Sequence, residues 1–258
     1  MDAQAAAAML HEAWTNGTKL AALPEPVRPR TRVEGYAVQA ALARQAGGAL
    51  YGWKIAGTNA AGRRHINVAA PLAGRVLAQC VLAAGAPASL AGTVLRVAEP
   101  EFAFRMARDL PPRAAPYTAR EAADAVASLH PAIEIPDTRF ADVVSAGEAQ
   151  LIADLACGHQ FRLGPPAPPT WRGLDLAAHR LSAAIGDGPP ASGEGRNVLG
   201  DPRAALAWLV NELSGLGITL RAGDVVTTGV ATVPLAVAPG DVLRADFGEL
   251  GRVTLGFV

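Results

Sequence analysis

Between residues 97 and 106 the chain alternates acidic and apolar positions, and this period of two predicts a β-strand with one buried face. Glu99 and Glu101 would point to one side of the sheet. The side chains that would point to the other side are Phe102, Phe104 and Met106. Pro100 has no N–H to donate to a neighbouring strand, so we expect this strand to lie at a sheet edge, to start there or to be bulged there.

A second segment, residues 130–137, repeats this arrangement. Ile133 and Ile135 would face a core while Glu134 faces the opposite way. Three carboxylates on two short strands can hold a hard divalent cation, because oxygen ligands suit Mg²⁺, Mn²⁺ or Ca²⁺, whereas zinc prefers His and Cys. The alternative is an ordinary half-buried strand whose acidic face lies in water.

The remaining patterns predict an α+β chain. Segments with helical periodicity and end signals are residues 3–16, 31–46, 118–129, 145–155 and 201–216. Short apolar runs cut by Gly and Pro, which predict strands, are residues 50–57, 93–106, 131–136, 225–230 and 252–258. We expect a polar loop at residues 60–64. Short strand-like runs become frequent from about residue 74. This change predicts an N-terminal helical, α+β portion over residues 1–73 and a β-rich domain over residues 74–258.

The composition restricts the class of partner. Half of the 258 residues are hydrophobic, so the chain can bury a substantial core. The 23 basic and 23 acidic residues are interspersed without a basic stripe, which argues against nucleic acid and anionic membranes as partners. Asp2 stands where a secretory signal would be positively charged, and no apolar span has membrane length, so we expect a cytoplasmic protein. The two cysteines, Cys80 and Cys157, form no C-x-x-C pair and predict neither a disulfide framework nor a zinc site.

The chain contains only two lysines, and all its other basic residues are arginine. Lysine offers a compact ammonium that a guanidinium does not replace. Lys19 lies in a polar stretch, and we expect it to be solvated. Lys54 lies within an apolar strand-like run, where an unpaired charge is costly, so it is a candidate site residue. The alternative is a side chain that extends to the surface.

Other motifs carry little functional information. The Gly-rich segment 192–197 lacks the lysine and the Ser or Thr of a phosphate-binding loop. His65, His130 and His159 are scattered, and such histidines are more often structural or at the surface than bases. No Ser-His-Asp or Cys-His grouping stands out.

Five short motifs, spread along nearly the whole chain, are informative together because of the order in which they occur. They are Gly52-Trp53-Lys54-Ile55, the strand with Glu99 and Glu101, Pro131–Ile135 with Asp137 and Arg139, Asn197–Gly200 leading into Ala205–Leu209, and Thr227-Thr228-Gly229. Together they resemble the 2-keto-4-pentenoate hydratase / 4-oxalocrotonate decarboxylase family, within the fumarylacetoacetate hydrolase superfamily.

The resemblance implies a mixed β-barrel roll that carries the site, an N-terminal helical portion packed against it, and assembly as a homo-oligomer. It implies Mg²⁺ or Mn²⁺ as the cofactor. By the same resemblance the metal positions are Glu99, Glu101 and Glu134, and the catalytic positions are Lys54 and Glu134. The substrate-binding positions that it implies are Lys54, Asp137, Arg139 and Thr228.

The implied function is a metal-dependent hydratase of aromatic-compound degradation, which adds water to a 2-hydroxy-2,4-dienoate and gives a 4-hydroxy-2-oxo acid. A 2-oxo acid can chelate the cation through its carboxylate and ketone oxygens, and the cation then acts as a Lewis acid. Lys54 would pair with the substrate carboxylate or help to move a proton, since an apolar wall disfavours its charged form. The alternatives are a 2-oxo-3-enedioate decarboxylase of the 4-oxalocrotonate type, a C–C bond hydrolase, or a non-catalytic protein that binds a 2-oxo acid or serves as a structural partner.

The chain departs from the hydratase pattern at Val68–Gly74. Many such hydratases carry acidic residues there, in a Val-Asp-x-Pro-Asp type of segment, and this chain has neither acid. Another group or a bound water must then supply the proton transfer. Decarboxylation needs the same electron sink but no activated water, so the missing acids keep that alternative open. Cys157 and Gly158 stand where many relatives have serines, a change that would alter the pocket wall.

Overall fold

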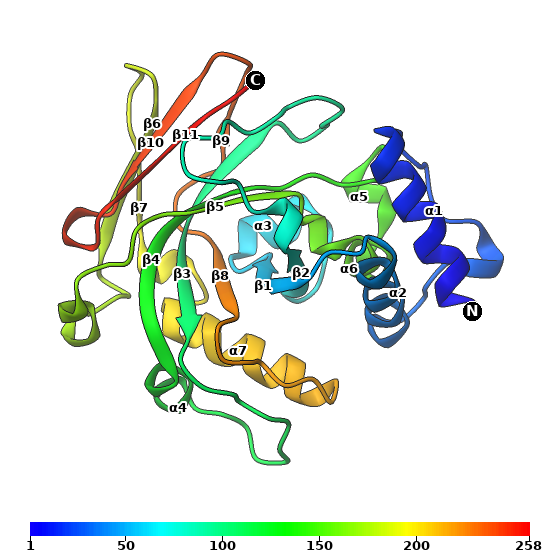
Figure 1. Ribbon diagram of the computed structural model, residues 1–258, viewed down its shortest axis with the longest axis horizontal. Coiled ribbons are helices and arrows are strands. Elements are labelled where there is room, and N and C mark those ends of the chain that lie inside the picture. The colour runs from blue at the N-terminus through cyan, green and yellow to red at the C-terminus, as the bar shows by residue number, and fades with distance from the viewer.

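The computed structural model describes residues 1–258 and contains a curled seven-stranded sheet, a smaller antiparallel sheet and flanking helices (Figure 1). The large sheet has the order β2-β1-β8-β3-β4-β5, and β9 pairs with β3 outside this path. Its strands are β1 (Leu50–Ala56), β2 (Leu72–Leu77), β3 (Val97–Met106), β4 (Val126–Ile135), β5 (Gln160–Leu163), β8 (Val225–Val230) and β9 (Leu235–Ala236). The β1–β8 pair is parallel and the other pairs are antiparallel, so the sheet is mixed. The predicted α+β class with a rolled mixed sheet is confirmed.

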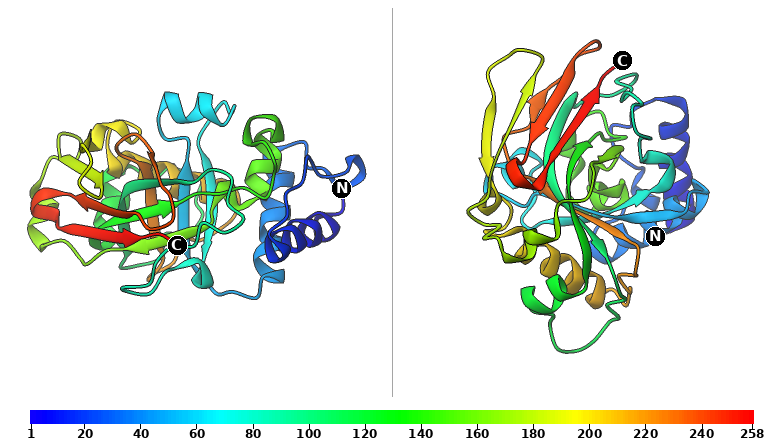
Figure 2. Two further views of the ribbon diagram at one scale, coloured as in Figure 1. Left: turned by 90° about the horizontal axis from the view of Figure 1, so that it is seen from above. Right: turned by 60° about the vertical axis from the view of Figure 1, so that its left-hand side comes forward.

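The small sheet lies at the opposite end of the molecule from the N-terminal helices (Figure 2, left). It has the order β11-β10-β6-β7. Its strands are β6 (Arg180–Ile185), β7 (Ala191–Glu194), β10 (Val242–Asp246) and β11 (Arg252–Gly256). All of its pairs are antiparallel.

The longer helices begin where polar side chains cap them. Asp2 caps α1 (Ala3–Asn16), and Thr31 forms a capping box with Glu34 at the start of α2 (Arg32–Gln45). Asp201 caps α7 (Pro202–Gly215), whose first residue is proline, and α7 lies beside β8 and α4 (Figure 1). These three helices confirm the predictions for residues 3–16, 31–46 and 201–216.

Several shorter elements differ from the expected ones. The predicted polar loop at residues 60–64 is the helix α3 (Ala60–His65), because Asn59 caps it by accepting a hydrogen bond from the Gly62 N–H at 2.7 Å. The helix expected over residues 118–129 is α4 (Ala119–Asp124), and β4 begins at Val126, where pairing with β3 replaces helical hydrogen bonds.

Glycine divides the helix expected over residues 145–155. The two pieces are α5 (Val143–Ala146) and α6 (Glu148–Ala153), and Gly147 between them has φ +82°. The chain also contains short 3₁₀ helices at Glu25–Val27, Ala78–Cys80, Leu155–Cys157, Pro169–Gly173, Gly195–Asn197 and Gly248–Leu250.

The alternation in β3 and β4 is confirmed. The apolar side chains on one face of these strands join the main core cluster of the protein; they are Phe102, Phe104, Met106, Ile133 and Ile135. Phe102 packs edge to face on Phe247, with 5.2 Å between the ring centroids. The opposite face carries the glutamates together with a smaller apolar cluster that includes Ala103, Ala132 and Phe161.

Pro100 lies in an interior strand, so the expectation of an edge strand is wrong. The expected irregularity lies nearby, since the register between β3 and β8 shifts between Glu101 and Ala103. One residue of β3, Phe102, lies opposite two residues of β8, Thr228 and Gly229, which places a bulge in β8 at this point.

The sheet crosses the expected boundary between residues 73 and 74. Strand β1 belongs to the N-terminal portion, yet it pairs with β8 of the C-terminal portion. The division into residues 1–73 and 74–258 stays a prediction. No helix of the chain is both long enough and apolar enough to span a bilayer.

Candidate metal centre and adjoining pocket

Three glutamates from β3 and β4 converge on one point. Glu99 lies directly opposite Glu134 in the antiparallel β3–β4 pair, and Glu101 follows two residues later on the same face of β3. One carboxylate oxygen from each of the three lies within 4.8 Å of the other two. Glu101 and Glu134 are buried. The convergence predicted from the alternating pattern is therefore present.

The Glu101 carboxylate is held on one side only. Its Oε2 atom accepts hydrogen bonds from the Thr227 hydroxyl and from the Gly229 N–H, the latter at 2.7 Å. Its Oε1 atom is buried and has no hydrogen-bond partner. Gly229 adopts φ +97°, a conformation that favours glycine, and this lets the bulge in β8 turn its N–H toward the carboxylate.

Glu134, like Glu101, has one carboxylate oxygen with a partner and one without. Its Oε1 atom lies 3.0 Å from Lys54 Nζ, while its Oε2 atom is buried without a partner. Lys54 also donates a hydrogen bond to the Ala156 carbonyl at 3.0 Å, and only 2% of the residue is exposed. Lys54 therefore belongs to the cluster and does not extend to the surface.

The charges in this cluster do not balance. Burial raises the pKa of Glu101 well above its usual range, and the neighbouring Glu134 and Glu99 add to the rise. Burial and Glu134 likewise raise the pKa of Glu99 to about 7. Burial alone would lower the pKa of Lys54, but Glu134 and the other two glutamates outweigh it and the pKa is raised. The expected effect of an apolar wall on the charged lysine is present but outweighed, because carboxylates lie around the ammonium.

The residues fit a hard divalent cation. Two buried carboxylate oxygens lack partners, and a third carboxylate lies beside them. A single ammonium cannot balance three carboxylates, and all the donors are oxygens, the ligands that Mg²⁺, Mn²⁺ and Ca²⁺ prefer. A cation at this point would satisfy both orphaned oxygens and relieve the repulsion between the glutamates.

A left-handed turn presents the carbonyl that Lys54 contacts. Leu155, Ala156 and Cys157 have φ of 55°, 52° and 63°, a rare conformation for residues other than glycine. Gly74 makes room for the turn, because a Cβ there would lie 2.0 Å from the Leu155 carbonyl oxygen. Strained backbone of this kind persists only where its surroundings hold it in place.

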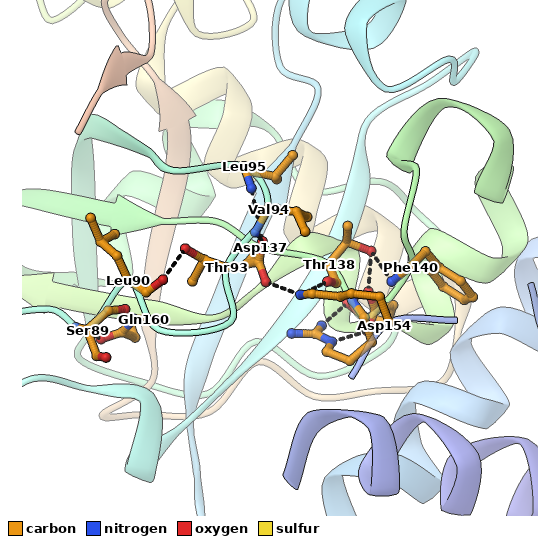
Figure 3. Close-up of polar contacts among 12 residues, drawn as sticks. Ser89, Leu90, Thr93, Val94, Leu95, Asp137, Thr138, Phe140, Asp154 and Gln160 are labelled. Carbon is orange, nitrogen blue, oxygen red and sulfur yellow. Dashed lines mark hydrogen bonds and ion pairs between the residues drawn. The ribbon is translucent and has the colours of Figure 1, made fainter. Parts of the chain in front are cut away.

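Arg139 and Asp154 hold that turn. Their side chains form a fully buried ion pair, and Arg139 also donates to the Gly158 carbonyl at 2.9 Å. The Asp154 carboxylate accepts hydrogen bonds from the Thr138 hydroxyl at 2.7 Å and from the Arg139 N–H at 2.8 Å (Figure 3). Arg139 thus brackets residues 155–157 and does not reach the glutamates.

Asp137 organises the loop before β3. Its Oδ1 atom accepts hydrogen bonds from the N–H groups of Val94 and Leu95, at 2.8 and 3.2 Å (Figure 3). Its Oδ2 atom lies 2.5 Å from Lys19 Nζ. The expectation that Lys19 is simply solvated is therefore wrong. The carboxylate of Asp137 is fully engaged and does not line the pocket.

Thr228 faces away from the cluster. Its hydroxyl donates to the Phe102 carbonyl at 3.0 Å, whereas the preceding Thr227 contacts Glu101. Of the site residues predicted from the sequence, the structure brings together Lys54, Glu99, Glu101 and Glu134. It does not bring Asp137, Arg139 and Thr228 to the same place.

A cavity of about 390 Å³ adjoins the cluster. Lys54 and Glu99 lie in its wall, and Lys54 is the only lysine or arginine there. Cys157 also lines it, and burial raises the pKa of this thiol to about 12, so the thiol is neutral. Most of the remaining wall is apolar and includes Ile55, Ile66, Leu95, Val97, Val230 and Val233.

The connection between β1 and β2 supplies much of one wall of this cavity. It contributes Thr58 and His65 among others, and α3 stands out from the sheet at this point (Figure 2, left). Sequence reasoning missed Thr58 and did not assign His65, because the segment has the composition of a polar loop. Residues 68–74, where an acid was sought, contribute nothing to the cavity wall.

Comparison with known proteins agrees with this geometry. The family model for the fumarylacetoacetate hydrolase C-terminal domain matches residues 75–258. Over 254 residues the chain is 32% identical to a 2-keto-4-pentenoate hydratase of Burkholderia vietnamiensis, covering 97% of this chain and 95% of the relative. It is 30% identical over 257 residues to a 2-hydroxyhexa-2,4-dienoate hydratase of Comamonas testosteroni, covering 96% and 94%.

A solved structure shares the whole fold. The 4-oxalocrotonate decarboxylase from Pseudomonas putida G7, complexed with magnesium and adipate, superposes with a TM-score of 0.88. The match covers 99% of this chain and 97% of that one, at 23% sequence identity. At this identity the likeness establishes the architecture alone.

Proposed function

This chain belongs to the fumarylacetoacetate hydrolase family, and we propose that it is a divalent-metal-dependent hydratase that adds water to a 2-hydroxy-2,4-dienoate. The product would be a 4-hydroxy-2-oxo acid, and the setting the breakdown of aromatic compounds. The observation that carries the proposal is a cavity whose wall combines Lys54 and Glu99 of the acidic cluster with apolar side chains. The names of the full-length relatives support the same reaction.

We assign the cation to Glu99, Glu101 and Glu134, and we expect Mg²⁺ or Mn²⁺. When bound, the cation would draw electron density from the 2-oxo group of the substrate. The protein keeps its ligands in place beforehand, because Thr227 and Gly229 hold Glu101 and Lys54 holds Glu134. Lys54 itself lies where it can pair with the carboxylate of a bound 2-oxo acid.

Hydration also requires proton transfer away from the acidic cluster. The 2-hydroxyl of the dienol loses a proton and carbon 5 gains one, after which water adds its oxygen to carbon 4 and a proton to carbon 3. We assign the transfer at the far end of the substrate to His65. It lines the cavity, it is exposed to solvent, and imidazole is the side chain that most often serves enzymes as a general acid or base. His65 would then supply what the missing acids of residues 68–74 do not.

The apolar wall favours hydration over decarboxylation. A 2-oxo-3-enedioate carries a second carboxylate at its far end, and an ionised group there needs a cationic partner. The basic side chains of the cavity wall are Lys54, which lies beside Glu134, and His65, which we assign to proton transfer, so neither is left over for a second carboxylate. A monocarboxylate with a short alkyl tail fits these surroundings better, because its apolar end would be buried against apolar side chains.

Product analysis tests the proposal. The protein would be incubated with 2-hydroxypenta-2,4-dienoate and, separately, with a 2-oxo-3-enedioate, in Mg²⁺, in Mn²⁺ and after chelation. We expect a product that has gained one water from the dienoate, with no activity after chelation. Carbon dioxide release from the diacid would support the decarboxylase, and chain cleavage of a longer substrate would support the C–C bond hydrolase. Binding of a 2-oxo acid without turnover of any substrate would support the non-catalytic alternative.

Two expectations about the setting of the enzyme belong to the same proposal. We expect the chain to assemble as a homo-oligomer and to act in the cytoplasm, on a small molecule and without nucleic acid or membrane partners. Sedimentation of the purified protein measures the first, and a single species with the mass of one chain would contradict it.

A further inference from the structure

Thr58 carries a buried hydroxyl that nothing in the protein satisfies. The residue follows β1, only 3% of it is exposed, and it lines the cavity beside the acidic cluster. Its Oγ1 atom has no hydrogen-bond partner. A buried hydroxyl without a partner is destabilising, and folded proteins leave few of them. The position therefore indicates a partner that enters from the cavity.

The hydroxyl lies next to the glutamate cluster. A Cβ placed on Gly229 would lie 2.1 Å from Thr58 Oγ1, so the hydroxyl packs directly against this glycine. The N–H of the same Gly229 donates to Glu101. Thr58 is fixed there by its backbone, because its carbonyl accepts a hydrogen bond from the Leu199 N–H at 3.1 Å.

The other orphaned polar atoms have different surroundings. Two of them, Glu101 Oε1 and Glu134 Oε2, belong to the carboxylate cluster, where a cation accounts for them. Trp53 Nε1 and Arg162 Nε lie in residues that do not line the cavity. Thr58 is the one orphaned hydrogen-bond donor that lies in the cavity wall.

We propose that Thr58 is a substrate-binding residue whose hydroxyl donates a hydrogen bond to a carboxylate oxygen of the bound 2-oxo acid. The inference rests on the proposed function for the class of ligand. Lys54 and the cation would bind the same end of the molecule, so its carboxylate comes within reach of the hydroxyl. A hydrogen bond to an ionised acceptor is about twice as strong as one between neutral groups.

Two substitutions separate this role from a structural one. T58V keeps the shape of the side chain and removes the hydroxyl, whereas T58S keeps the hydroxyl. Oxalate binding in the presence of Mg²⁺ would be measured by calorimetry, and thermal unfolding would be followed without ligand. We expect T58V to weaken oxalate binding by about 10- to 100-fold and T58S by no more than about threefold. The Tm of ligand-free T58V should equal or exceed that of the unmodified protein, because no satisfied hydrogen bond is lost.

The outcomes that overturn the inference are distinct. If T58V binds oxalate as tightly as the unmodified protein, the Thr58 hydroxyl does not bind the substrate. T58V that fails to fold, or that lowers the Tm in parallel with binding, shows that the hydroxyl has a structural partner instead. Mg²⁺ affinity measured alone should not change in T58V, and a parallel loss would make Thr58 part of the metal site.

Oxalate binding does not require turnover, so the two proposals fail separately. If the unmodified protein binds oxalate but hydrates no dienoate, the hydratase proposal fails and Thr58 is still tested. If the enzyme hydrates a dienoate and T58V binds oxalate normally, only the Thr58 inference fails. An unmodified protein that binds neither oxalate nor pyruvate in Mg²⁺ would contradict both.

Discussion

Glu99 and Glu134 lie directly opposite each other on adjacent antiparallel strands, in the middle of a sheet. Like charges in this arrangement destabilise a strand pair. Lys54 compensates part of the repulsion through its ion pair with Glu134, and Glu101 then adds a third carboxylate. A cation bound between the carboxylates would compensate the remaining repulsion and would explain why the glutamates are paired.

Glu101→Gln should abolish turnover without unfolding the protein. Glutamine keeps an oxygen for Thr227 and Gly229 but cannot supply a negatively charged ligand. Affinity for Mn²⁺ should therefore fall by more than about 100-fold. Loss of a residue that only hydrogen-bonds to a metal ligand lowers metal affinity by about 10- to 100-fold. In the presence of a chelator the Tm should not fall, because glutamine keeps the acceptor for Thr227 and Gly229 and is neutral, as burial favours for Glu101 without a cation. Calorimetric titration with Mn²⁺ and circular dichroism measure both effects. Glu12→Gln, on the exposed surface of α1, is the matched control, and full activity of Glu101→Gln would contradict the metal role.

Lys54→Met should impair substrate binding or turnover more than metal binding. Methionine fills similar space without the ammonium, so the substrate carboxylate and Glu134 both lose their cationic partner. We expect kcat/KM to fall by about 100- to 1000-fold, the scale for removing a preorganised charge from an active site. Lys54→Arg should not rescue activity, because the planar guanidinium cannot take the place of an ammonium between Glu134 and the Ala156 carbonyl. Unchanged kinetics of Lys54→Met would show that the lysine has no role in substrate binding or turnover.

The acidic cluster could be predicted because strand periodicity is a local property. Alternation alone places Glu99 and Glu101 on one face and Phe102 on the other, and the structure agrees. The partners of Asp137 and Arg139 could not be predicted in this way. Lys19 lies 118 positions from Asp137 in the chain, and the left-handed turn that Arg139 holds has no signal of its own in the sequence.

The residues that line the cavity could not be predicted from the sequence either. The sequence predicts a polar loop at residues 60–64, and the cap formed by Asn59 explains why this segment is a helix. Thr58 and His65 become candidates once the fold places them in the cavity, because a threonine or a scattered histidine carries no functional signal by itself.

Arg139→Met should destabilise the protein by about 3–5 kcal/mol, because it leaves the buried Asp154 carboxylate without its partner. Turnover of the folded fraction should also fall, since the turn at residues 155–157 would no longer hold the Ala156 carbonyl against Lys54. Urea unfolding gives the stability. Replacing both partners, Arg139→Met with Asp154→Leu, should cost less than the sum of the two single changes, and strict additivity would contradict a coupled pair.

His65→Gln should slow turnover by about 100- to 10,000-fold, the usual contribution of a proton-transferring side chain. Binding of Mg²⁺ and of oxalate should be unaffected, because His65 lies on α3 and contacts neither the glutamates nor Lys54 by any hydrogen bond. Single-turnover kinetics separate the two effects. If His65→Gln retains full activity, the assignment of His65 is wrong, and another group or a bound water replaces the missing acids.

His159 should make a contribution to stability that is lost as the pH drops from about 6.5 to about 4, opposite in sign to that of the buried glutamates. Burial, with Arg139 adding to it, lowers the pKa of His159 to about 4, whereas a histidine in the unfolded chain titrates near 6.5. Between these values the unfolded state binds a proton that the folded state does not, so acid favours unfolding. The effect should not exceed about 3 kcal/mol. Chemical denaturation at pH 7.5 and 4.5 measures it: relative to the unmodified protein, His159→Gln should be more stable at pH 4.5 than at pH 7.5. An unaltered difference between the two proteins would contradict the assignment.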